Sequence, residues 1–136
     1  MLGATKVDPK FSGDFKSHLK FFQLQDIGIF SGGGNLDVAL EYPEVDYVRL
    51  QIALKGSATT TINGTTTETN ENRSCTTGPG RASQIVCRDG DGMSLRMSFG
   101  AVERKLALLL GAQPKGQLEL WPRQMSISHV SGLCIK

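Results

Sequence analysis

The chain has little of what most metal sites and secreted scaffolds need. Its 136 residues include three cysteines, Cys75, Cys87 and Cys134, with no CxxC spacing among them. An odd number of cysteines without such spacing argues against a disulfide scaffold and favours reduced thiols in a cytoplasmic protein. The two histidines, His18 and His129, stand near opposite ends of the sequence. A histidine-rich zinc or iron site is therefore not expected.

Long apolar runs are also missing. The longest, Leu106 to Leu110, has five residues, far short of the roughly 20 that cross a membrane. The first segment, MLGATKVDPK, has no apolar stretch of a signal peptide, and residues 1–10 are expected to be a flexible end. Lys and Arg total 15 against 13 Asp and Glu, a net charge of +2. So weak a charge argues against a strongly electrostatic nucleic-acid-binding protein.

Motifs for cofactor binding and catalysis are incomplete. Gly32–Gly34 is not followed by Lys-Ser or Lys-Thr, which argues against a phosphate-binding loop. Asp89 and Asp91 lack the other positions of a calcium-binding loop. The spacing of cysteines and histidines gives no support for a nucleophile and base pair. We therefore expect no catalytic residue, no metal and no cofactor, and we do not expect an enzyme.

One early segment has the spacing of a helix. Phe11, Phe15, Leu19 and Phe22 follow each other at intervals of four, four and three residues, which places them on one helical face. We expect a short helix that ends near Lys20.

The middle of the chain has the pattern of a β protein. Residues 47–54 alternate between apolar and mostly polar side chains, and residues 93–99 do the same, as half-buried strands do. Shorter strands are expected at residues 23–30, 36–40, 59–62, 65–69, 73–77 and 83–87.

Glycines are expected to separate these strands. Ser31–Gly34 and Lys55-Gly56 each end a strand, and Asp89–Gly92 forms a turn. Asn63-Gly64 predicts a two-residue type I′ hairpin, because both central residues of that turn need positive φ. The threonine-rich strands of this hairpin carry little apolar area, so we expect them at an edge or on a solvated face.

The clearest helix begins near residue 98. Ser98 or Gly100 caps its N-terminus, and Gly111 suits the left-handed position after its last turn. Its apolar stripe consists of Val102, Leu106, Leu109 and Leu110. Leu118–Trp121 is expected to be a strand, and residues 123–136 are compatible with a helix. Together the elements predict a mainly β fold, an antiparallel barrel or jelly roll with one or two flanking helices.

Such a barrel encloses an apolar lumen that can hold a small ligand. The lumen candidates come from the even-numbered face of residues 47–54, the odd-numbered face of residues 93–99 and one later aromatic residue: Val48, Leu50, Ile52, Leu95, Met97 and Trp121. The same residues would equally form a plain hydrophobic core. Arg49, Gln51 and Arg96 have the opposite parity, so they face solvent, a partner chain, or the pocket if the inside face is the other one.

Three stretches follow one another in a characteristic order. They are the strand YVRLQIALKGSATTTING, the Pro79-Gly80 turn and the segment MSLRMSFGAVERKLALLLGAQPKGQLELWP. Over about residues 15–122 the chain resembles the N-terminal sensor domain of AraC/XylS-type transcription regulators. Gly56 matches the glycine that closes the family's long strand. The helix and strand that end the family's domain are matched by Leu106, Leu109, Leu110, Gly111, Leu118, Leu120, Trp121 and Pro122.

The resemblance implies a cupin-like barrel without a metal, formed by residues 11–122, that binds a small effector or mediates dimerisation. It also implies a C-terminal domain with two helix-turn-helix units that binds DNA. The 136 residues contain no such domain, and residues 123–136 would begin a linker or a dimerisation helix. A piece of a longer regulator and a naturally short homologue both fit this expectation.

The function that follows is the effector-sensing and dimerisation domain of a bacterial AraC-type regulator. We expect a cytoplasmic homodimer that binds a small effector, has no membrane contact and reaches DNA only through the missing domain. One alternative is a small stand-alone cupin-like barrel enzyme, against which the missing histidine cluster counts. The other is a purely structural dimerisation module whose lumen is packed by Met93, Leu95 and Met97.

Overall fold

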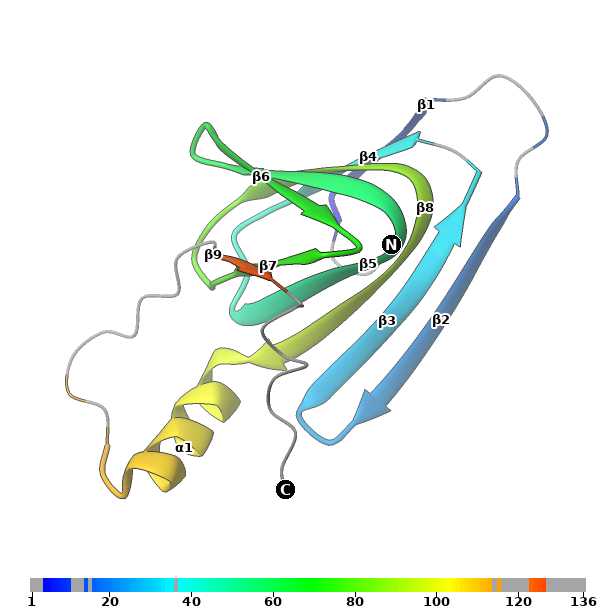
Figure 1. Cartoon of the computed structure of the whole chain (residues 1–136). Coiled ribbons are helices and arrows are strands. Elements are labelled where there is room, and N and C mark those ends of the chain that lie inside the picture. Colours follow the sequence, from blue (N-terminus) through cyan, green and yellow to red (C-terminus); the bar gives the residue numbers. More distant parts are fainter. Residues whose placement is uncertain are drawn as a thin grey trace.

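The chain folds into two facing layers of antiparallel strands with a helix at one end (Figure 1). The computed structural model describes residues 4–10, 14, 16–35, 37–113, 115 and 123–126. Within these ranges the elements are β1 (Lys6–Lys10), β2 (Ser17–Leu24), β3 (Ile27–Gly34), β4 (Asp37–Tyr42), β5 (Tyr47–Ile62), β6 (Thr65–Asn70), β7 (Arg73–Thr77), β8 (Ser83–Ser98), α1 (Phe99–Leu110) and β9 (Arg123–Ser126). The predicted mainly β, antiparallel class is confirmed.

Strands β5 and β8, of 16 residues each, form the frame of the fold. They pair with each other along nearly their whole length, with register shifts beside Lys55, where both strands curve from one layer into the other (Figure 1). The predicted strand end at Lys55-Gly56 and the predicted turn at Asp89–Gly92 are therefore wrong. These glycines lie at irregularities inside long strands, where glycine often occurs at a β-bulge or a tight bend.

The bend depends on close approach of the two backbones. Gly56 has φ +77, and a Cβ built there would lie 2.6 Å from the carbonyl oxygen of Asp89. A Cβ on Gly90 would collide with the carbonyl oxygen of Lys55. Side chains at these two positions would push β5 and β8 apart, so glycine is required where the frame turns.

The other strands add to the two halves of this frame. Along one edge of β8, β4 pairs with its first half and β3 with its second half. Strand β1 extends the sheet from β4, and β2 extends it from β3. On the other side β6 and β7 pair with β5, and β9 pairs with β7. Among the described strands β1, β2 and β9 each have one neighbour, so the sheet is cupin-like without closing into a barrel.

The N-terminal third differs most from the sequence prediction. The helix predicted over residues 11–20 is wrong for its described part, because Ser17–Leu24 is strand β2. Ser31–Gly34 does not end a strand but completes β3, where Gly32 faces Gly92 and Gly34 faces Gly90 in β8. The N-terminal residues expected to be flexible include β1, which pairs with β4. Pairing with β3, the next strand of the same hairpin, overrides the local helical spacing.

The Asn63-Gly64 hairpin is confirmed. Ile62 faces Thr65 across the turn, and both turn residues have positive φ, +50 for Asn63 and +77 for Gly64. Its placement on a solvated face is wrong for part of it, since Thr60 and Thr69 are each 1 % exposed. A threonine side chain is small and β-branched, which allows it to fill a tight interior beside a strand.

Helix α1 begins and ends as the sequence predicts. The Ser98 hydroxyl accepts a hydrogen bond from the Ala101 amide at 3.3 Å, and Gly111 has φ +68 in the left-handed region. The predicted apolar stripe is only partly buried: Val102 and Leu106 are half-buried, whereas Leu109 and Leu110 are exposed together with Leu108. The C-terminal half of the helix therefore presents leucines to solvent.

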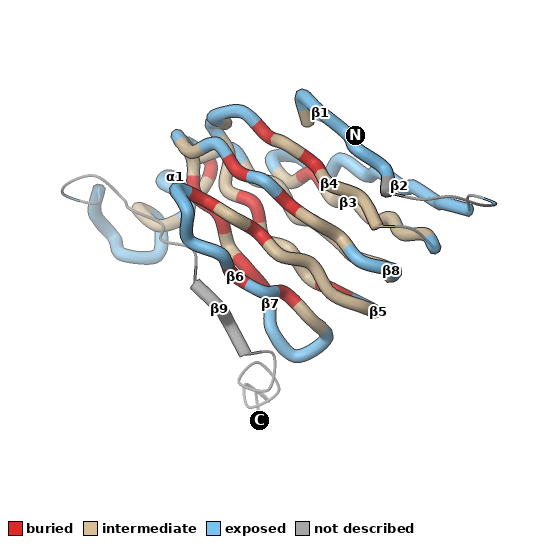
Figure 2. The backbone as a smooth tube through the Cα atoms, turned by 90° about the horizontal axis from the view of Figure 1, so that it is seen from above, coloured by how far each residue is buried: buried red, intermediate tan, exposed pale blue. Residues whose placement is uncertain are grey.

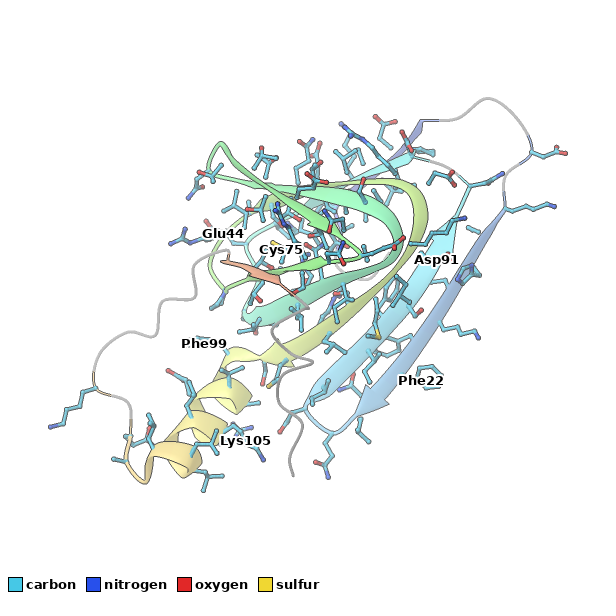
Figure 3. All side chains as sticks on the ribbon, viewed as in Figure 1. Phe22, Glu44, Cys75, Asp91, Phe99 and Lys105 are labelled. Carbon is cyan, nitrogen blue, oxygen red and sulfur yellow. The ribbon has the colours of Figure 1, made fainter. Side chains whose placement is uncertain are left out.

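The core lies between the layers. Figure 2 shows most of the buried positions on β4 to β8, while β1 and β2 are largely exposed. Leu40, Tyr42 and Ile85 form its central cluster. Cys75 is fully buried among the side chains that crowd between the layers, whereas Phe22 on β2 and Lys105 on α1 point away (Figure 3).

Some predicted elements lie near the end of the sequence. The strand expected at Leu118–Trp121 falls outside the described residues. Arg123–Ser126 is strand β9, paired with β7 from Arg73 to Thr76, so a helix over these four residues is wrong. No helix among the described residues is long and apolar enough to cross a membrane.

Candidate functional site

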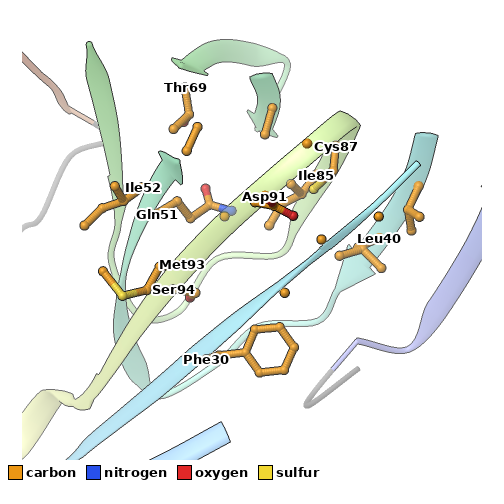
Figure 4. Close-up of a pocket in the computed structure, with 18 of the residues that line it drawn as sticks. Phe30, Leu40, Gln51, Ile52, Thr69, Ile85, Cys87, Asp91, Met93 and Ser94 are labelled. Atoms are coloured by element: carbon orange, nitrogen blue, oxygen red, sulfur yellow. The ribbon is translucent and has the colours of Figure 1, made fainter. Parts of the chain in front are cut away.

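A cavity of about 240 Å³ lies between the two layers. Strands β2, β3, β4, β5 and β8 supply most of its wall, and β6 contributes Thr69 (Figure 4). The larger apolar side chains that line it are Leu19, Phe30, Val38, Leu40, Tyr42, Ile52, Ile85 and Met93. Mainly apolar walls with a few polar groups are typical of small-molecule sites.

The structure reverses the expected inside face of the first half of β5. Arg49, Gln51 and Ala53 line the cavity, and Arg49 is only 3 % exposed. Of the even-numbered candidates, Ile52 lines the cavity, whereas Val48 and Leu50 do not. Strict alternation identifies two faces of a strand but does not say which one turns inward.

The candidates from β8 follow the same pattern. Leu95 and Met97 do not line the cavity; they pair with Leu50 and Val48 and form a second apolar row on the other face of the layer. Met93 lines the cavity beside Ile52. Trp121 lies outside the described residues. Of the five predicted lumen residues that the structure describes, only Ile52 lines the cavity.

Arg49 reaches across the interior from β5. Its Nη2 donates a 2.9 Å hydrogen bond to the Ser83 hydroxyl, and its guanidinium carbon lies 4.3 Å from the ring centroid of Tyr42. Its Nε and Nη1 are buried and have no hydrogen-bond partner in the part of the chain that the structure describes. A buried cation is thus held by one hydroxyl and one aromatic face.

Arg96 on β8 is the second arginine of the cavity. It is directly opposite Arg49 in the β5–β8 register. Its guanidinium carbon lies 5.1 Å from the ring centroid of Tyr47 and 5.8 Å from that of Tyr42. The Nε of Arg96, like the Tyr47 hydroxyl, is buried without a partner among the described residues.

Other polar groups surround this arginine pair. Gln51 accepts a 2.7 Å hydrogen bond from the Thr60 hydroxyl. The hydroxyls of Ser94 and Thr69 are buried and have no partner within the described ranges, and both residues line the cavity. Figure 4 shows Gln51 and Ser94 at the part of the wall formed by β5 and β8. The cavity therefore combines apolar walls with hydrogen-bonding groups whose capacity is unused.

The charge of the wall is positive. Its cationic side chains are Arg49, Lys55, Arg88 and Arg96, and its single carboxylate among the described residues is Asp91. Asp91 Oδ1 lies 3.6 Å from His18 Nε2, near the end of the cavity where β2 meets the bend of β8. No carboxylate of the described residues therefore offsets the positive charge of the arginine pair by ion-pair contact.

Burial shifts the pKa values of this region. Desolvation lowers the pKa of Arg49 below its ordinary value, against the opposing effect of Tyr42 and Tyr47. Desolvation also raises the pKa of Tyr42 above 10.0, although the two arginines pull it down. Because Tyr42 keeps its proton at neutral pH, it offers Arg49 an aromatic face and no negative charge.

A second hollow, of about 350 Å³, adjoins the cavity. It shares Ser17, His18, Gly34, Lys55, Gly90 and Asp91 with the wall of the first. The shared residues place it at the bend of the frame, on the side where the β2–β3 hairpin meets β8. Neither in this hollow nor in the rest of the described ranges do three His, Cys, Asp or Glu side chains form a group that could hold a metal ion.

Residues 1–130 match a family model described as AraC-binding-like domain. The chain belongs to this family. Among solved structures, this AraC-binding-like domain is similar to the AraC-like transcriptional activator CuxR, with a TM-score of 0.62 and 17 % identity. The likeness covers 77 % of this chain and 43 % of that one, so the domain spans less than half of the activator.

Two further structures show the same fold in other proteins. Protein Ylba from E. coli matches with a TM-score of 0.60 and 10 % identity over 93 % of this chain and 51 % of its own. The Cnp3 cupin domain of Schizosaccharomyces pombe matches with a TM-score of 0.50 and 11 % identity over 76 % of this chain and 79 % of its own. The AraC-binding-like domain is thus cupin-like in fold. The search of curated proteins found no match.

Proposed function

We propose that this AraC-binding-like domain is the effector-sensing and dimerisation domain of a bacterial AraC-type transcription regulator. The observation that carries the proposal is the cavity of about 240 Å³ inside a domain of this family. Its apolar walls provide affinity, and its polar groups orient the ligand. In this proposal, contact with DNA belongs to a separate helix-turn-helix domain.

The control of DNA binding is allosteric in this proposal. The cavity is bounded by both layers, so an effector that contacts both changes how readily they move relative to each other. An effector shifts the regulator between two arrangements only by the difference in its affinity for them. The domain then acts without catalysis, in the cytoplasm, where the regulated DNA lies.

A cavity-filling variant tests effector sensing. A library of small organic metabolites is screened for compounds that raise the Tm of the chain. Ala58 on β5 lines the cavity, and Ala58→Leu is expected to abolish the Tm increase from any hit. Ala39→Leu on β4, outside the cavity wall, is the matched control and is expected to keep it.

The second readout is DNA affinity of the full regulator that carries this domain. The same hit is expected to change that affinity, and Ala58→Leu is expected to remove the change while leaving basal DNA affinity intact. Absence of any stabilising compound, or equal stabilisation of both variants, contradicts the proposal. In the alternative of a small cupin-like enzyme, a hit would be consumed; in the alternative of a packed structural module, no compound would bind.

We propose a second copy of this chain as the partner in dimerisation. Its support is the exposed end of α1, where Leu108, Leu109 and Leu110 are 78, 76 and 67 % exposed. Clustered exposed leucines of this kind mark interaction surfaces, and a helix face can pair with its own copy about a two-fold axis. Leu109→Glu is expected to halve the mass measured by light scattering, whereas Leu54→Glu on β5, also exposed, is the control that keeps it.

A further inference from the structure

We propose that the cavity takes a small organic acid, whose carboxylate is held between Arg49 and Arg96 and whose apolar body lies against the walls around Phe30, Leu40 and Ile85. This inference rests on the proposed effector-sensing function and names the chemical class of the effector.

The first support is a buried charge without a counter-ion. Ionised side chains are rarely buried unless they are paired, because removal of a charge from water is costly. Arg49 is 3 % exposed and forms no ion pair in the described part of the chain. Its Nε and Nη1 are also unpartnered there. An anion in the cavity would supply both the missing charge and the missing hydrogen-bond acceptor.

The second support is the position of Arg96. Like charges placed directly opposite each other on paired strands repel and weaken the sheet. Arg49 and Arg96 are such a pair, and both line the cavity. A carboxylate between them turns the repulsion into two charge-assisted contacts, which are stronger than neutral hydrogen bonds. The guanidinium of Arg49 lies over the ring of Tyr42, and that of Arg96 lies over the ring of Tyr47. Neither contact uses the unpartnered Nε and Nη1 of Arg49 or the unpartnered Nε of Arg96 as hydrogen-bond donors among the described residues.

The third support is the shape and chemistry of the remaining wall. A cavity of about 150 Å³ holds benzene in another protein, and this one measures about 240 Å³. A ring or short chain with one carboxylate fits that volume, whereas a dinucleotide does not. Apolar residues opposite the arginines favour an acid with a hydrocarbon body over inorganic phosphate, which would leave them without contact.

The experiment compares acids with neutral compounds of the same shape. The probes are 3-phenylpropionate with 3-phenylpropionamide, hexanoate with hexanamide, and inorganic phosphate. Each is titrated into the chain at constant ionic strength, and binding is measured by calorimetry. Each carboxylate is expected to bind at least tenfold more tightly than its amide, because only the carboxylate pairs with the arginines.

Variants assign the preference to the two arginines. Arg49→Met and Arg96→Met keep much of the side-chain volume and remove the charge. Each is expected to reduce the ratio of acid to amide affinity to within about twofold of one. Arg73→Met on β7 is the control, since Arg73 is exposed and lies outside the cavity wall. Circular dichroism checks folding, and Arg96→Met decides the outcome if Arg49→Met fails to fold.

Each outcome is decisive. Four results would overturn the inference. The first two are equal affinity for acid and amide, and no binding by any probe. The other two are tighter binding of phosphate than of the acids, and a preference for the acid that persists in Arg96→Met. If neutral compounds bind and change the DNA affinity, the inference that the ligand is an organic acid is wrong, but the proposed effector sensing still holds. If acids bind and leave the DNA affinity of the full regulator unchanged, the ligand is an organic acid and the proposed effector sensing is wrong.

Discussion

The guanidinium of Arg49 rests on the ring of Tyr42, 4.3 Å from its centroid, and this contact joins the two layers of the fold. Tyr42 ends β4, which pairs with the first half of β8, whereas Arg49 belongs to the half of β5 that pairs with the second half of β8. The contact is also part of the central core, since Tyr42 packs with Leu40 and Ile85. Stability and the proposed ligand binding therefore both involve the same pair of side chains.

Tyr42→Leu is expected to lower the free energy of unfolding by about 2–4 kcal/mol, because it removes a buried ring and the face on which Arg49 rests. Tyr42→Phe keeps the ring and is expected to stay within about 1 kcal/mol of the wild type. Urea denaturation measures both variants. Equal stability of the leucine and phenylalanine variants would show that the aromatic face does not support Arg49.

Gly56→Ala is expected to destabilise the fold at the bend of β5 and β8. Gly56 and Gly64 share the same φ of +77, but a Cβ meets the Asp89 carbonyl oxygen only at Gly56. Gly64→Ala therefore measures the cost of positive φ alone, about 1 kcal/mol. We expect Gly56→Ala to cost at least about 1 kcal/mol more than this control in thermal or urea denaturation. Similar values for both variants would contradict a tight bend.

Stability is expected to fall at alkaline pH because of buried thiols. Burial raises the pKa of Cys75 and of Cys87 from their ordinary value of 9.0. The unfolded chain then loses these protons at lower pH than the folded chain, so their contribution is complete below pH 9.0 and declines as the pH rises from 9.0 toward the folded pKa values. Unfolding by urea at a series of pH values under reducing conditions measures the decline.

The matched variant for this pH series is Cys75→Ala, since Cys75 is fully buried. It is expected to lower stability at pH 7 through lost packing and to flatten the decline above pH 9.0. A decline of unchanged steepness would contradict the assignment to Cys75. Burial likewise raises the pKa of Tyr42 above 10.0, so a further loss begins at higher pH and persists in the variant.

Ser98→Ala is expected to lower stability by about 1 kcal/mol, because the Ala101 amide loses its acceptor at the start of α1. Ser98→Asp retains an acceptor oxygen at the cap and is expected to remain close to the wild type. Urea denaturation followed by circular dichroism measures both. If the alanine variant matches the wild type, the hydroxyl does not cap the helix.

Some features of the fold follow from the local sequence, and others depend on long-range strand pairing. The hairpin at Asn63-Gly64 and the ends of α1 at Ser98 and Gly111 follow from residue types at fixed positions. The strand end and the turn predicted from the glycines near Lys55 and Asp91 are wrong, because glycine is common both in turns and at bends inside long strands. Only the pairing of β5 with β8 distinguishes the two cases.

The sequence by itself determined the antiparallel β class, the type I′ turn, the capped helix and the resemblance to AraC-type sensor domains. Turn residues, side-chain alternation and the order of motifs can all be read directly along the chain, without knowledge of which strands pair. Only the tertiary structure decided that Arg49 and Arg96, rather than Val48 and Met97, face the cavity. Alternation supplies two faces for every strand, and the choice between them depends on which layer closes over it.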